Sequence, residues 1–88
     1  MYKLVFTKDA QKQLTVLAKK APNAIKKLEV LLQEICEHPR TGTGQVEQLK
    51  HCAEETWSRR ITREHRLTYQ IHDDVVEVLV LAVYGHYR

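Results

Sequence analysis

The spacing of the apolar residues changes halfway along the chain, and this change restricts the possible folds more than any other feature. In residues 8–37 the apolar side chains recur every three or four positions, which is the repeat of an α-helix. In residues 57–84 they alternate with polar residues or follow one another directly, as in β-strands. The chain therefore predicts the α+β class, with helices in its first half and most of its sheet in the second.

The first half predicts a short strand over residues 1–6, followed by two helices. Thr7 is a suitable N-cap for the first helix, and Asp9 favours its first turn because the amino end of a helix attracts negative charge. Pro22 ends this helix and suits the opening turn of the second, which stops before Pro39. The apolar stripes are Ala10, Leu14, Leu17, Ala18 and Ala21 in the first helix, and Ile25, Leu28, Leu31, Leu32 and Ile35 in the second. The outer face of the second helix, which should meet solvent, holds Lys26, Lys27, Glu29 and Glu34.

The second half predicts strands over residues 57–61, 65–71 and 75–84. Along the middle one, the alternation separates Leu67, Tyr69 and Ile71 from Arg66, Thr68 and Gln70. We therefore expect the helical hairpin to pack on the apolar face of an antiparallel sheet, while the other face stays polar and carries arginine. Residues 41–45 contain two glycines but no following Lys-Ser/Thr pair, so they predict a plain turn rather than a phosphate-binding loop.

Size and composition predict one domain over residues 1–88 and exclude several classes of protein. No apolar run approaches the roughly 20 residues of a membrane span, and charges follow the first residues too soon for a secretory signal. Two cysteines are too few for a disulfide scaffold, so we expect a cytoplasmic protein. A zinc site from Cys36, His38, His51 and Cys52 is a weaker alternative to two unrelated thiols, because the spacing matches zinc patterns poorly.

The charge of the chain is +3 and its pI is about 9.0, which is a weak indication of a polyanionic partner. The distribution is more informative, because residues 57–66 hold four arginines and one glutamate. The planar guanidinium suits phosphate groups better than an ammonium does. Taken alone, this segment is either a nucleic-acid-binding surface or an ordinary solvated one.

Three segments resemble the YoeB toxins, a branch of the RelE superfamily. They are GTGQVEQLK at 42–50, WSRRITREHRLTY at 57–69, and the final HY pair at 86–87. The resemblance implies the RelE-like microbial RNase fold and a toxin of a type II toxin–antitoxin system. Its activity would be that of a ribosome-dependent mRNA endoribonuclease (an mRNA interferase), which cuts mRNA in the A site and inhibits translation without a metal or another cofactor.

The resemblance also implies partners. These are a cognate antitoxin of the YefM/Phd type, the ribosome and its mRNA, and a second copy of the chain in a homodimer. Operator DNA would be bound only through the antitoxin, and no membrane is involved.

RNA can be cut by its own 2′-hydroxyl, which needs a base, an acid and cations on the phosphate. The resemblance assigns the base to Glu47, the acid to His86 and the phosphate contact to Arg66. A histidine can hold and release a proton near neutral pH, which suits the acid role. Tyr87 would stack on a base or pack on the sheet. The expected RNA contacts are Lys50, Arg60 and Arg63.

The neighbours of these residues are expected to have supporting roles. Arg59 should face away from Arg60 and be structural. Glu64 and His65 should orient the arginines. Trp57 should belong to the core or to a dimer contact.

Two positions depart from the family pattern. Val46 replaces a proline that often precedes the glutamate, which should loosen the loop, and Arg88 follows the usual final tyrosine, which adds a cation near the site. Two other functions stay open at this point. One is a ParE-like toxin that poisons DNA gyrase without RNase chemistry, and the other is a non-catalytic nucleic-acid-binding domain.

Overall fold

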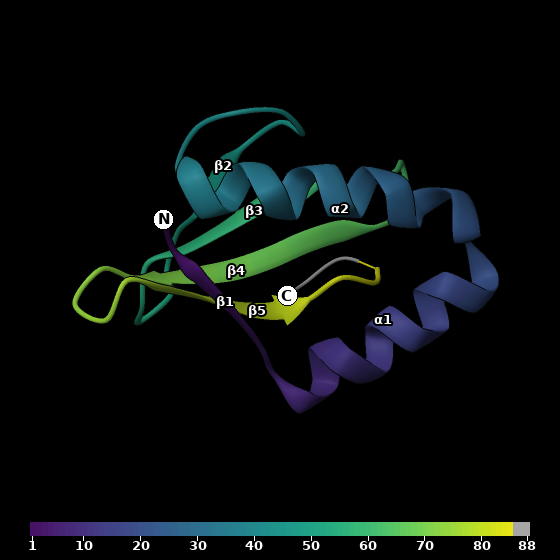
Figure 1. Cartoon of the computed structure of the whole chain (residues 1–88), viewed down its shortest axis with the longest axis horizontal. Coiled ribbons are helices and arrows are strands. Elements are labelled where there is room, and N and C mark those ends of the chain that lie inside the picture. Colours follow the sequence, from purple (N-terminus) through teal and green to yellow (C-terminus); the bar gives the residue numbers. More distant parts are fainter. Residues whose placement is uncertain (86–88) are drawn as a thin grey trace.

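The computed structural model describes residues 1–85, which form two helices and a five-stranded sheet. Figure 1 shows the second helix running along the sheet, while the first runs obliquely from the end of the first strand to the start of the second helix. The elements in chain order are β1 (Lys3–Phe6), α1 (Lys8–Lys20), α2 (Pro22–Glu37), β2 (Glu47–Leu49), β3 (Thr56–Arg60), β4 (Arg66–His72) and β5 (Glu77–Ala82). The predicted α+β class is confirmed.

The sheet has the order β1-β5-β4-β3-β2 and is mixed. The pairs β2–β3, β3–β4 and β4–β5 are antiparallel, as predicted, but β1 pairs with β5 in parallel, with Lys3 opposite Glu77. Expecting a wholly antiparallel sheet was therefore wrong for this edge. Two parallel neighbouring strands need a long connection, and the elements from α1 to β4 form the connection between β1 and β5.

The helix boundaries follow the local signals that the sequence carries. The Thr7 hydroxyl accepts a hydrogen bond from the backbone N–H of Ala10 at 3.0 Å, which is the predicted N-cap. Pro22 occupies the first turn of α2, where its missing N–H costs nothing, and α2 ends before Pro39. Ala18 is exposed rather than part of the stripe, and α1 meets the sheet mainly along β5 and β1.

The core lies between the helices and one face of the sheet. It contains Ala10, Leu17, Ala24, Leu28, Leu31, Ile35, Ile61, Leu67, Tyr69, Ile71, Val78, Val80 and Val83. The alternation predicted for β4 is confirmed, because its three apolar residues all belong to this cluster.

The strands differ from prediction mainly at their ends. β5 is shorter than the expected strand over 75–84, since Val75 and Val76 lie in an exposed turn. β2 was not predicted, because its three residues carry no apolar alternation and its strand geometry comes from pairing with β3. Within residues 1–85, neither helix combines the length and the apolar character needed to cross a membrane.

Candidate active site

The strand register gathers several of the predicted site residues on the face of the sheet away from the helices, which we call the outer face. Ser58 on β3 lies opposite Glu47 on β2 and opposite Thr68 on β4. Arg60 lies opposite Arg66 one step further along. Because residues paired across neighbouring strands project to the same face, the five side chains form two adjacent rows. The predicted separation of the arginine face from the helices is therefore confirmed for Arg66.

Arg66 leans toward the row that contains Glu47. Its Nη1 atom donates a hydrogen bond to the Ser58 hydroxyl at 3.2 Å. Arg66 is half-buried, while Glu47 and Arg60 are exposed. A carboxylate and a guanidinium are thus presented on one face. The guanidinium has further N–H donors, and no side-chain partner for them is found within residues 1–85. Ser58 was not predicted as a site residue, and a serine within a strand carries no distinctive signal.

The middle of the outer face is polar, as predicted, but it is buried. Thr68 is completely buried, and its hydroxyl lacks a hydrogen-bond partner within the described residues. It was expected on the polar face, and it lies there at the centre of the sheet between Ser58 and Ala82.

Residues 83–85, which follow β5, continue beside β4 as far as Arg66. The backbone N–H of Arg66 donates to the carbonyl of Gly85 at 3.0 Å. Gln13 of α1 accepts hydrogen bonds from the N–H groups of Val83 and Tyr84 through its Oε1 atom, at 2.9 and 3.2 Å. Two residues far apart in sequence, Gln13 and Arg66, therefore hold residues 83–85, and nothing in the sequence pattern singles out Gln13.

The other predicted site residues lie outside the described part of the chain or at the edges of the outer face. His86 and Tyr87, the expected acid and stacking residue, lie outside the described residues, as does Arg88. Arg63 is exposed in the turn between β3 and β4, at one end of the outer face.

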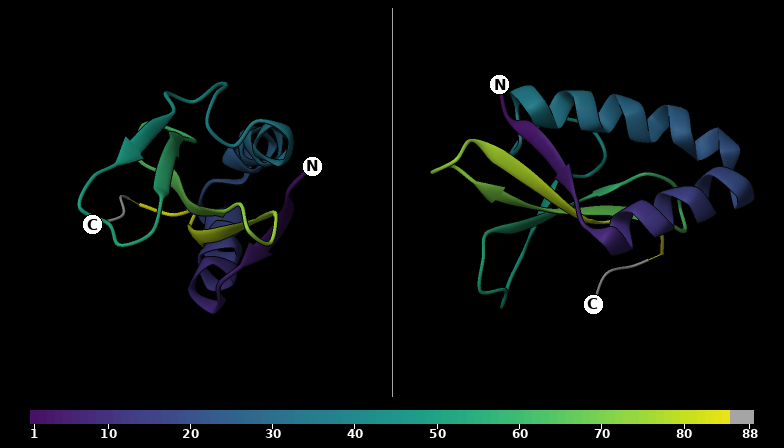
Figure 2. Two further views of the ribbon diagram at one scale, coloured as in Figure 1. Left: turned by 90° about the vertical axis from the view of Figure 1, so that its left-hand side faces the viewer. Right: turned by 60° about the horizontal axis from the view of Figure 1, so that its bottom comes forward.

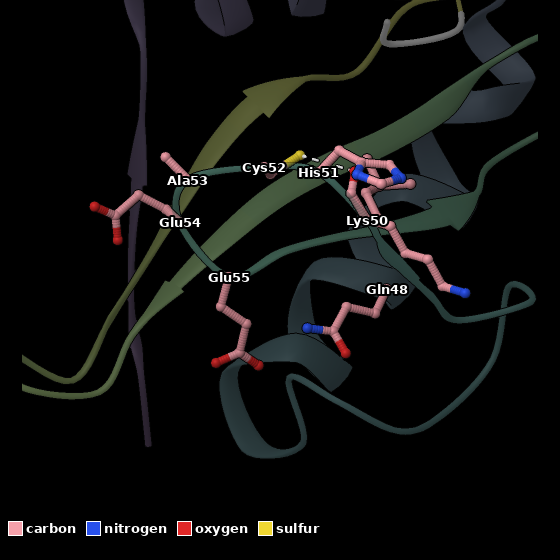
Figure 3. Close-up of a pocket in the computed structure, with 8 residues that line it drawn as sticks. Gln48, Lys50, His51, Cys52, Ala53, Glu54 and Glu55 are labelled. Atoms are coloured by element: carbon pink, nitrogen blue, oxygen red, sulfur yellow. Dashed lines mark hydrogen bonds between the residues drawn. The ribbon is translucent and has the colours of Figure 1, made fainter.

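Lys50 is exposed where β2 leads into the loop before β3. This loop projects from the sheet on the side away from α2 (Figure 2, right). Residues 48–55 line a hollow of about 420 Å³, in which the Lys50 and His51 side chains lie on one side and Glu54 on the other (Figure 3). Within residues 1–85 the cysteines and histidines form no group that could hold a metal, so the zinc alternative has no geometric basis there.

Arg59 organises the loop that leads to Glu47. Its side chain is fully buried on the helix side of the sheet, as its predicted structural role requires. It donates to Glu34 Oε1 at 2.9 Å and to the Tyr69 hydroxyl at 3.0 Å. It also donates to the carbonyls of His38 at 2.7 Å and Thr41 at 2.8 Å.

Glu34 was expected on the outer face of α2 and is partly exposed there, but its carboxylate is engaged by the loop and by β3. Its carboxylate accepts hydrogen bonds from the hydroxyl and the backbone N–H of Thr43, as well as from Arg59. These contacts, those from Thr43 first, lower the pKa of Glu34 below its ordinary value. The glycine loop is thereby anchored to both α2 and β3, although Val46 stands where proline would have stiffened it.

A second ion-pair cluster fixes the opposite end of β3. Arg40 contacts Glu55 through two hydrogen bonds, of 2.7 and 2.9 Å, and Asp73 through one of 2.7 Å. The Trp57 indole donates to Glu55 at 2.8 Å, and its ring packs against the core, which agrees with one of its two predicted roles. Hydrogen bonds from Arg40 first, and from Trp57, lower the pKa of Glu55. The pKa of Asp73 is lowered by its hydrogen bond from Tyr2 first, and then by Arg40.

His65 does not orient the arginines as predicted. Its Nδ1 atom accepts a hydrogen bond from the backbone N–H of Gly85 at 2.9 Å. Its ring stacks on Tyr84 with the centroids 4.4 Å apart. No ion pair of Glu64 is found among the described residues.

The sequence and the fold of this chain are similar to those of bacterial toxins. Residues 6–87 match the family described as the YoeB-like toxin of bacterial type II toxin-antitoxin systems. Toxin YoeB of Escherichia coli K12 is 43% identical over 63 residues, which cover 72% of this chain and 73% of that protein. The YoeB dimer from Staphylococcus aureus has a TM-score of 0.84 at 27% identity, covering 98% of both chains. The toxin in a heterotetrameric YoeB-YefM toxin-antitoxin complex from the same organism has a TM-score of 0.81 at 27% identity, covering 99% of both chains.

Proposed function

Because the chain belongs to the YoeB-like toxins of bacterial type II toxin–antitoxin systems, we propose that it is a ribosome-dependent mRNA endoribonuclease. It would cut mRNA in the ribosomal A site and so stop translation. The observation that best supports this proposal is the placement of Glu47 and Arg66 on one outer face, with Gly85, the residue before His86, bound to Arg66.

The proposed reaction needs no atom that the RNA and the side chains do not supply. Glu47 takes the proton of a 2′-hydroxyl, and the 2′-oxygen attacks the adjacent phosphorus. The bond from phosphorus to the 5′-oxygen breaks, which leaves a 2′,3′-cyclic phosphate. His86 gives its proton to the departing 5′-oxygen, and the Arg66 guanidinium binds the charge that grows on the phosphate oxygens.

The surrounding residues would hold the RNA. Lys50, Arg60 and Arg63 are exposed cations around the outer face, and together they suit a bound phosphate backbone. Tyr87 would stack on a base beside the cut. The chemistry described above uses proton transfer and cationic side chains, so we propose that cleavage needs neither a metal nor another cofactor.

The relatives suggest the partners. We propose that a YefM-like antitoxin binds and inhibits this chain, as the YoeB-YefM complex of Staphylococcus aureus suggests, and that operator DNA is bound only through that antitoxin. We also propose a homodimer, by analogy with the YoeB dimer. A toxin that acts on translating ribosomes would work in the cytoplasm.

Single-turnover cleavage of mRNA on purified ribosomes tests the assignment. Removing a general base or acid typically lowers the rate by about 10²–10⁴-fold, so Glu47→Ala and His86→Ala should each do so while ribosome binding is retained. Arg66→Ala should weaken both cleavage and binding, because its charge also attracts the phosphate before reaction.

Glu37→Ala and His38→Ala are matched controls, because both side chains are exposed beside the C-terminal end of α2 and make no part of the outer face. Near-normal cleavage by folded Glu47→Ala and His86→Ala proteins would refute their roles. Wild-type protein that binds ribosomes and leaves mRNA intact would favour a non-catalytic binding domain, and inhibition of gyrase instead would favour a ParE-like toxin. Loss of cleavage in EDTA, with ribosomal magnesium controlled, would contradict metal independence.

A further inference from the structure

The side chain of His65 lies where the chain passes from the described sheet to the residues that the proposed reaction needs. We propose that His65 is a positioning residue, and that its Nδ1 atom fixes the backbone of Gly85, the residue directly before His86. This inference rests on the proposed function, because it concerns the placement of His86. It assigns no proton transfer to His65 itself.

The hydrogen bond determines the chemical form of the ring. Nδ1 accepts from the backbone N–H of Gly85 at 2.9 Å, so this nitrogen carries no proton and the neutral ring holds its proton on Nε2. The ring also stacks on Tyr84, with an interplanar angle of 29°. His65 therefore contacts two consecutive residues of the segment directly before His86.

His65 is itself held firmly by the turn between β3 and β4. The Thr62 hydroxyl accepts hydrogen bonds from the backbone N–H groups of Glu64 and His65, each at 3.2 Å. The carbonyl of His65 accepts from the N–H groups of Ile61 and Thr62, at 3.0 and 3.1 Å. The imidazole thus projects from a closed turn rather than from a free loop, which is what a positioning residue requires.

Gly85 is held through both of its backbone polar groups. The His65 ring accepts from its N–H, and the backbone N–H of Arg66 donates to its carbonyl. Its φ of +69° lies in the left-handed region that glycine adopts without strain, so the chain can turn at this residue. His65 and Arg66 are consecutive. The two residues together bind Gly85, which precedes the proposed acid, and Arg66 is also the proposed phosphate ligand.

A matched set of substitutions separates the hydrogen bond from the stacking. His65→Phe keeps an aromatic ring against Tyr84 and loses the acceptor. His65→Asn loses the ring, but its amide oxygen takes nearly the position of Nδ1 and can accept the same hydrogen bond. His72→Phe is the control, because this histidine lies at the other end of β4 and the one hydrogen bond found for its side chain within residues 1–85 is with Gln70.

Two measurements are needed on each variant. Hydrogen exchange of the Gly85 amide, read by NMR, reports the hydrogen bond without reference to activity, with the Val83 amide as an internal reference because Gln13 holds it independently. Single-turnover mRNA cleavage on ribosomes reports the consequence. We expect His65→Phe to lose Gly85 protection and to cleave about 10²-fold more slowly, with ribosome binding unchanged, since small misplacements of reacting groups cost rates of that order. His65→Asn should recover most of both losses.

The outcomes distinguish this inference from the proposed function. If His65→Phe loses Gly85 protection and still cleaves at the wild-type rate, the positioning role is overturned. Equal cleavage defects in His65→Phe and His65→Asn would also overturn it, because the acceptor would then not matter. If wild-type protein cleaves no mRNA, the proposed function fails, while the exchange data still show whether His65 holds Gly85.

Discussion

Replacing Arg59 with methionine should be among the most damaging single changes in the described part of the chain. The Arg59 side chain is fully buried, and removing it leaves its hydrogen-bond acceptors without their shared donor. Four of these contacts are 3.0 Å or shorter, and they involve Glu34, Tyr69 and two backbone carbonyls of the loop after α2. The acceptors lie on α2, on β4 and in the loop, so the loss affects three parts of the fold.

The size of the effect follows from counting these contacts. A hydrogen bond from a charged donor contributes about 1.5–3 kcal/mol, so four would sum to about 6–12 kcal/mol if they were independent. They are not independent, and water can reach part of Glu34, whose side chain is 33% exposed. Breaking a buried pair by removing one partner usually costs about 3–5 kcal/mol, and we expect Arg59→Met to fall in that range. A domain has about 5–15 kcal/mol in total, so little stability would remain.

Urea unfolding followed by tryptophan fluorescence measures this change, because the chain has a single tryptophan, Trp57, on the same strand. Each kcal/mol lost should lower Tm by about 4–8 °C in a domain of this size. Arg59→Lys keeps the charge but has fewer donors in a different geometry, so it should cost less than Arg59→Met. A loss below about 1 kcal/mol in Arg59→Met, with an unchanged m-value, would refute the idea that this network holds the loop.

Two further predictions concern stability. The pKa values of Glu34 and Glu55 are lowered on folding, so the stabilisation they give is present above their ordinary pKa of 4.5 and is lost as the pH falls through the lower folded values. Urea midpoints that stay constant down to about pH 3 would contradict this prediction. Glu34→Gln should weaken the pH dependence, because it removes one of the two titrating groups. Gly44→Ala should cost more than about 1 kcal/mol, because φ is +92° and an added Cβ would lie 3.1 Å from both the Arg60 carbonyl and Leu31. Gly85→Ala should cost less in thermal unfolding, because no atom of the described residues outside its chain neighbours lies within 4 Å of an added Cβ there.

The sequence predicted those parts of the fold that local chemistry determines. Thr7 caps a helix because of its own hydroxyl, and Pro22 and Pro39 restrict their own backbones and those before them. The apolar alternation of β4 likewise reports a face of the sheet directly. The parallel pairing of β1 was not predictable in this way, because it depends on which edge of the finished sheet is free.

The site was predictable only as far as residue type and resemblance allowed. The alternation along β4 predicted that Arg66 lies on the outer face. Its contact with Ser58 was not predictable, because it depends on the register between β3 and β4. Glu34 gave the same signal as any charged residue on a helix, and its pairing with Arg59 arises only when a loop closes over both. The link from His65 to Gly85 joins a side chain to a backbone group of another residue, and backbone groups are the same in every sequence.

The position of β5 within the sheet has a consequence for the order of folding during synthesis. This strand is the last to be made, yet it lies between β1 and β4, and Lys3 is paired with Glu77. β1 therefore has no strand to pair with until nearly all of the described chain has been translated. Contacts between such distant parts of a sequence slow folding, because a long loop must close before they form. The complete sheet of this toxin therefore forms only after translation has passed β5, because β5 joins β1 to the other strands.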